Sequence, residues 1–128
     1  MTVRIIRLGT PRLPGEGARI GTVRRPPRGV PKERYAAENW YDVWYPELAP
    51  SPDLMSRAKQ ATTDKEWLAF IRGFRSEMNE PSARRTLDLL AALSHHADFS
   101  VGCYCEDERR CHRSILRELL VERGAQIA

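Results

Sequence analysis

The junction between two periodic segments near the C-terminus constrains the fold of this chain more than any other feature. Phe99, Val101 and Cys103 alternate along a strand-like run. The apolar residues that follow repeat at helical spacing, namely Ile115, Leu116, Leu119 and Leu120. A strand that leads into an amphipathic helix is the unit from which open α/β sheets are built, and such folds bind ligands at the carboxyl ends of their strands. The sequence therefore predicts an α/β fold with a site at this junction.

The rest of the chain fits the same fold class. Residues 3–8 and 20–23 are rich in β-branched residues and predict two strands. Helical patterns predict short helices over 32–39 and 54–59 and longer ones over 63–78 and 81–96, the third of them opened by a capping box at Thr63 and Glu66. The order of elements predicts a single small three-layer α/β domain over residues 1–128, with a largely parallel sheet and flanking helices.

Composition narrows the class of protein. Hydrophobic residues make up 41% of the chain and charged residues 30%, which is typical of a globular domain. No apolar run approaches the roughly 20 residues that span a bilayer, and the N-terminus lacks the apolar centre of a signal peptide. We therefore expect a cytoplasmic protein with no membrane partner.

Positive charge is concentrated at the start of the chain. Residues 1–34 carry a net charge of +7 and the remainder −3, and 18 of the 21 basic residues are arginine. A guanidinium binds phosphate or carboxylate with a planar fork. The basic first third therefore suggests a phosphate-bearing small molecule or a nucleic acid as partner. The alternative explanation is that the arginine excess reflects the base composition of the genome.

All three cysteines lie within residues 103–114. Three cysteines in nine positions cannot form a disulfide framework, so reduced thiols or a bound metal are expected. Cys103, Cys105, Cys111 and His112 together offer three sulfurs and one nitrogen, which is an accepted ligand set for zinc. Adjacent residues of a helix diverge by about 100°, which weighs against Cys111 and His112 binding one ion.

Thiolate chemistry is a second interpretation of the same segment. Cys111 lies near a predicted helix N-terminus beside His112 and Arg113, surroundings that lower the pKa of a thiol, so Cys103, Cys111 and His112 are candidate catalytic residues. Cys103 also precedes Arg109 with the spacing of the cysteine-phosphatase loop, but the acidic residues at 106–108 would repel phosphate. The alternative is that the cysteines are core residues without a reaction.

A third interpretation is an anion site. Arg113 and His112 would supply positive charge, helped by Arg24, Arg25 and Arg28 in the loop after the second strand. In a parallel sheet this loop and the cysteine segment share one edge. The leading hypothesis is binding, with or without processing, of a nucleotide or nucleic-acid phosphate at this junction, with a zinc site as the main alternative.

An aromatic segment offers one further alternative. Four large aromatic residues fall within six positions: Trp40, Tyr41, Trp44 and Tyr45. We expect a lid packed on the sheet. A base-stacking surface, or the contact surface of an interaction module without chemistry, is the other possibility.

Several of these features together resemble domain-of-unknown-function family 488 of bacteria and archaea. They are the run Cys103-x7-Cys111-His112-Arg113, the Leu48–Ser51 turn, the Arg24–Val30 loop and the helix that holds Trp67, Phe70 and Glu77. The resemblance covers nearly the whole chain and implies a fold and a site rather than a particular reaction. In the family pattern the position of Cys105 is not consistently cysteine, so the resemblance favours a Cys103/Cys111 pair over a three-thiolate site.

Overall fold

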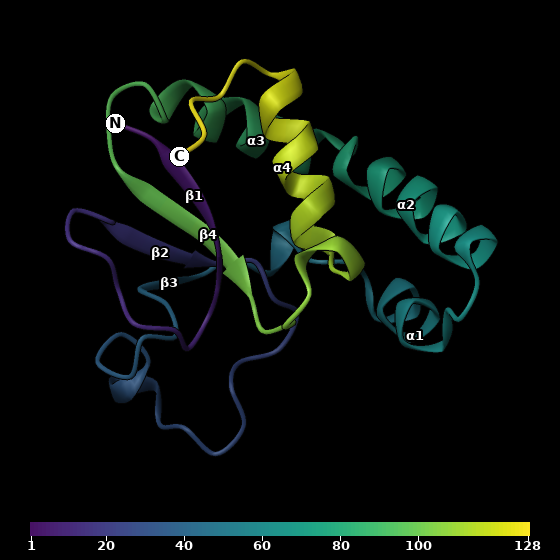
Figure 1. The fold of residues 1–128 in the computed structure, drawn as a ribbon, viewed down its shortest axis with the longest axis horizontal. Helices are drawn as coiled ribbons and strands as arrows, with labels where there is room; N and C mark the ends of the chain where they lie inside the picture. The colour runs from purple at the N-terminus through teal and green to yellow at the C-terminus, as the bar shows by residue number, and fades with distance from the viewer.

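A computed structural model describes all 128 residues and contains one parallel sheet (Figure 1). Its strands are β1 (Val3–Arg7), β2 (Ala18–Gly21), β3 (Val43–Trp44) and β4 (Phe99–Cys103). Their order is β1-β4-β2-β3, and every neighbouring pair is parallel. In the central register Val101 of β4 lies between Ile5 and Ile20. The α/β class and the parallel sheet predicted from the sequence are confirmed, and all strands end at the same edge.

The structure contains four α-helices and three short 3-10 turns. The helices are α1 (Pro52–Gln60), α2 (Asp64–Met78), α3 (Pro81–Leu93) and α4 (His112–Glu122), and the turns are η1 (Lys32–Arg34), η2 (Pro46–Leu48) and η3 (Glu108–Arg110). The predicted capping box is confirmed, because Thr63 Oγ1 accepts the Glu66 amide and the Glu66 carboxylate accepts the Thr63 amide. None of these helices combines the length and the apolar character that crossing a membrane requires.

The four α-helices pack on one face of the sheet (Figure 1). Val3, Phe99 and Val101 from the strands belong to the same buried cluster as side chains from every α-helix. These helical members include Leu54, Phe74, Leu87 and Leu116. Every second residue of β1 and β4 points toward this face. The apolar stripes of the helices cover these residues and complete the core.

Loops and the η1 turn cover the opposite face, and Arg19 holds them there. Arg19 is fully buried on β2, and its Nε donates to the Glu16 carboxylate at 2.5 Å. Its terminal nitrogens donate to the carbonyls of Asn39 and Pro11 at 2.6 and 3.2 Å. A buried charge is tolerated only when it is paired and hydrogen-bonded, and this guanidinium meets that condition with groups from both loops. The third layer is therefore built from loops.

Three predicted elements differ clearly in their bounds from those of the structure. The second strand covers residues 18–21 instead of 20–23, and the short helix predicted over 32–39 is only the η1 turn. Asn39 has a φ of 65°, a conformation that ends helical structure. The helix predicted over 81–96 ends at Leu93 and continues as a turn. The strand β3 was not predicted, because two residues inside an aromatic run carry no readable alternation. Hydrogen bonds from Asp42 and Tyr45 amides to β2 carbonyls place it at the sheet edge.

Candidate functional site

The junction of β4 and α4 brings together three potential metal ligands. Cys103 is the last residue of β4, Cys111 is the N-cap of α4, and His112 is its first residue. All three are buried, and their Sγ atoms and one ring nitrogen lie within 4.8 Å of one another. The divergence that helical spacing predicts does not apply, because Cys111 precedes the helix and has extended backbone angles of −134° and 151°. Its side chain can therefore turn toward that of His112.

The hydrogen bonds of His112 determine which ring nitrogen is available. Nε2 donates to the backbone carbonyl of Thr22 at 2.6 Å, so Nδ1 carries the free lone pair. Nδ1 lies 3.7 Å from Cys111 Sγ. The edge of the ring packs against Phe74, with ring centroids 5.5 Å apart. Burial lowers the pKa of His112 to about 4, so the imidazole is neutral at pH 7.

Cys105 lies on the solvent side of this cluster. Its side chain is exposed, whereas Cys103 and Cys111 are buried. Hydrogen bonds from the Cys103 and Cys111 thiols lower the pKa of Cys105. The same contact with Cys105, together with that to Cys111 and burial, raises the pKa of Cys103. The lowered pKa of Cys105 therefore favours the thiolate form at this position, on the solvent side of the two buried thiols.

Arg113 adds a buried positive charge to the cluster. Only 3% of the residue is exposed, and a terminal nitrogen donates to the Cys105 carbonyl at 2.5 Å. Its Nε is buried without a hydrogen-bond partner. The positive charge of Arg113 also contributes to the lowered pKa of Cys105. A cation here stabilises thiolate over thiol.

The predicted arginine loop meets the cysteine segment through its backbone. The Tyr104 hydroxyl donates to the Arg25 carbonyl at 2.9 Å. The Arg24 guanidinium points elsewhere, donating to the carbonyls of Ala49 and Pro50 at 3.1 and 3.0 Å. It therefore holds the Leu48–Ser51 turn, whose Ser51 amide in turn donates to the Glu77 carboxylate. Of the four predicted anion-binding arginines, only Arg113 reaches the sulfurs.

Two arginines of the loop are free to meet a ligand. Arg25 and Arg28 are exposed, and neither side chain forms a hydrogen bond or an ion pair in the structure. The phosphatase-like spacing gives no comparable arrangement: the Arg109 side chain is 91% exposed and pairs with Asp107, whereas Cys103 is buried. Arg109 is therefore in solvent while Cys103 is in the core, so the two do not form a shared phosphate-binding loop.

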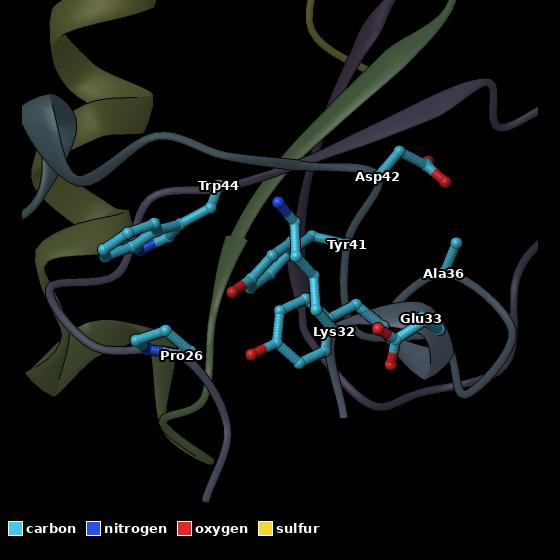
Figure 2. Close-up of a pocket in the computed structure, with 8 residues that line it drawn as sticks. Pro26, Lys32, Glu33, Ala36, Tyr41, Asp42 and Trp44 are labelled. Atoms are coloured by element: carbon cyan, nitrogen blue, oxygen red, sulfur yellow. The ribbon is translucent and has the colours of Figure 1, made fainter. Parts of the chain in front are cut away.

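The aromatic segment forms one wall of a pocket that sequence reasoning missed (Figure 2). The pocket has a volume of about 340 Å³. Its lining consists of Pro26, Lys32, Glu33, Tyr35, Ala36, Tyr41, Asp42 and Trp44. Tyr41 is buried, as expected of a lid, but 44% of Trp44 is exposed. The sequence did carry an indication of this pocket, because the aromatic run and the proline-rich basic loop both follow β2 and both contribute to its lining.

The pocket and the sulfur cluster share a wall. Tyr41 belongs to the same buried cluster as Cys103 and Cys111, together with Leu8 and Val23. The carboxyl ends of β2 and β4 hold the two sites next to each other, as expected for ligand sites in a parallel sheet.

Comparison with known families agrees with these features. The family model DUF488-N3a, described as the active DUF488-N3 subclade, matches residues 3–124. The chain belongs to the DUF488 family. This DUF488 match runs from β1 through α4 and therefore includes the Cys103–Arg113 segment, the arginine loop and the aromatic pocket. No curated protein and no solved structure matches the chain.

Proposed function

We propose that this DUF488 protein binds a transition-metal ion, zinc in the first instance, through Cys103, Cys111 and His112. The distance between Cys111 Sγ and His112 Nδ1 carries the proposal, at 3.7 Å. In a tetrahedral site with Zn–S near 2.3 Å and Zn–N near 2.05 Å, the sulfur and nitrogen are about 3.6 Å apart. The two ligands therefore already have the spacing that the ion requires.

The surroundings of His112 support the same assignment. A metal-binding histidine usually donates its second ring N–H to a carbonyl or carboxylate, which fixes its tautomer and orientation. The 2.6 Å hydrogen bond from Nε2 to the Thr22 carbonyl does this. Ligation also needs a neutral imidazole, and burial maintains that state by lowering the pKa of His112.

We assign Cys105 as the fourth ligand. It is exposed beside the group formed by Cys103, Cys111 and His112, whose ligand atoms lie within 4.8 Å of one another. With Cys105 turned inward, the set becomes three thiolates and one imidazole, a closed zinc site. Three thiolates around a divalent ion leave one negative charge. Arg113, buried beside them with an unpartnered Nε, supplies the compensating positive charge.

Metal analysis and cobalt substitution test this function. Protein purified without added metal should contain about one equivalent of zinc, and cobalt in its place should show a thiolate-to-metal absorption band. The variants Cys111→Ser and His112→Asn should lose the metal, whereas Cys105→Ser should retain it with weaker affinity. The matched control is His95→Asn, since His95 lies in the turn after α3 and its ring bonds to the Gly124 carbonyl, beyond the far end of α4 from His112. Far less than one equivalent of zinc, with no cobalt band, would reject the proposal.

A second function, binding of a nucleotide or nucleic-acid phosphate, is supported by Arg25 and Arg28. They lie exposed and unpaired on the loop after β2, within the basic first third of the chain. His112 and Arg113 are poorer candidates for this role, because both are buried and donate to carbonyls.

Salt dependence and a matched pair of double variants test this second function. Nucleotide or oligonucleotide affinity should fall as salt rises, because phosphate contacts release counterions. Replacing Arg25 and Arg28 together by alanine should weaken binding. Replacing Arg84 and Arg85, two consecutive exposed arginines of α3, should leave binding unchanged. Equal effects of the two pairs would indicate nonspecific attraction only.

A further inference from the structure

The aromatic pocket has the size and lining of a small-molecule site (Figure 2). Its volume of about 340 Å³ is at the lower end of the roughly 300–1,000 Å³ usual for ligand pockets. We propose that it binds the base and phosphate of a nucleoside monophosphate. This inference rests on the phosphate-binding function proposed above and assigns it a location and a ligand class.

Rigid aromatic rings form the apolar walls. Trp44 Nε1 donates to the Val23 carbonyl at 2.8 Å, which holds the indole in place while its ring remains partly exposed. Tyr35 and Tyr41 pack edge to face with ring centroids 5.1 Å apart. Aromatic rings held in this way favour a flat π-system as ligand, because stacking needs little further ordering.

A buried hydroxyl gives the pocket a polar contact for a base. The Tyr41 hydroxyl is buried and has no hydrogen-bond partner in the protein. Figure 2 shows it pointing toward the side of the pocket that Pro26 and Trp44 line. An unpaired buried hydroxyl is costly, and a ring nitrogen or carbonyl oxygen of a base would satisfy it.

The pocket offers one basic side chain, Lys32, to an anionic group on the ligand. Lys32 lines the pocket, and Pro26 is preceded in the chain by the exposed Arg25. Asp42 does not oppose an anion strongly, because its carboxylate accepts from Arg12 and from the Arg19 amide at 2.9 and 2.7 Å. Glu33 is then the one acidic side chain of the lining without a partner. Lys32 is the one basic side chain of the lining, and the exposed Arg25 and Arg28 belong to the same loop as Pro26.

Calorimetric titration of the full protein with adenosine 5′-monophosphate, adenosine and inorganic phosphate tests the assignment. The monophosphate should bind best, because only it has both the ring and the charge. Trp44→Ala should weaken binding about tenfold through lost stacking. Lys32→Ala should weaken it through lost charge, whereas the matched variant Lys59→Ala on α1 should not.

Tyr41→Phe separates ligand contact from a structural role. It removes only the unpartnered hydroxyl, so the thermal stability should stay equal or rise while the affinity for the monophosphate falls several-fold. Unchanged affinity in Trp44→Ala, Lys32→Ala and Tyr41→Phe would overturn the pocket assignment and leave the phosphate function standing elsewhere. No saturable binding of any nucleotide would overturn both. Tight binding of inorganic phosphate alone would overturn the base contact.

Discussion

Burial of His112 makes the stability of the metal-free protein depend on pH in a defined window. Its pKa is about 4 in the folded protein, because burial disfavours the charged imidazolium. In the unfolded chain a histidine titrates near 6.5. Below about pH 6.5 the unfolded state therefore binds a proton that the folded state does not bind until about pH 4. The free energy of unfolding must fall as the pH decreases.

The expected magnitude follows from these two pKa values. Each pH unit inside the window costs about 1.4 kcal/mol, and integration from pH 7.5 to pH 5 gives a loss of about 2 kcal/mol. Typical domains have unfolding free energies of about 5–15 kcal/mol, so this loss is readily measured. Above pH 7.5 the ring is neutral in both the folded and the unfolded state, so His112 does not change the free energy of unfolding there. Carboxylates whose pKa the fold lowers, such as Glu16, contribute mainly below this window.

Urea denaturation in the presence of a chelator measures the effect. The chelator is needed because a metal on Nδ1 would keep the proton off. His112→Asn removes the titrating ring, so its unfolding free energy should fall by about 2 kcal/mol less than that of the wild type between pH 7.5 and pH 5. The lowered pKa of Cys105 contributes a pH dependence that both proteins share. The matched variant His95→Asn should retain the wild-type slope. Parallel profiles for wild type and His112→Asn would refute a buried, neutral imidazole at this position.

Two further substitutions test the supporting structure. Glu16→Ala leaves the Arg19 charge buried without its carboxylate, so the free energy of unfolding should fall by about 3–5 kcal/mol in urea titrations. A loss below about 1 kcal/mol would show that the pair does not anchor the loop layer. Gly21→Ala places a Cβ 2.4 Å from the Tyr41 ring, which should cost about 1–3 kcal/mol and reduce monophosphate affinity. Gly73→Ala meets only the end of a flexible leucine side chain and should leave that affinity unchanged.

Local periodicity explains which parts of the fold could be predicted. The strand ending at Cys103 and the helix after it alternate with the periods of their elements, and both appear where predicted. The capping box at Thr63 and Glu66 acts within four residues, so it too was readable. The strand β3 was not, because its two residues depend on pairing with β2 rather than on a pattern of their own.

The sequence predicted that Cys103, Cys111 and His112 lie close together, but it did not predict the directions of their side chains. Closeness in the chain brings Cys103, Cys111 and His112 to one strand–helix junction. Whether Cys111 and His112 could face the same point depended on Cys111 lying outside the helix with extended backbone angles. A one-residue difference in the helix start decides this, and helix boundaries are the least certain feature of a sequence pattern.

The arginines show which features depend on neighbouring residues in the chain and which depend on tertiary contacts. Residue order alone determined the α/β class, the strand–helix junction and the basic loop that follows β2. Only the folded chain decided that Arg24 would bind the carbonyls of Ala49 and Pro50, and that Arg25 would remain exposed. A guanidinium binds whichever acceptors the fold brings within reach, and those acceptors come from residues distant in the chain. Secondary structure depends on neighbours a few positions away, whereas the ligands of a site depend on which segments meet.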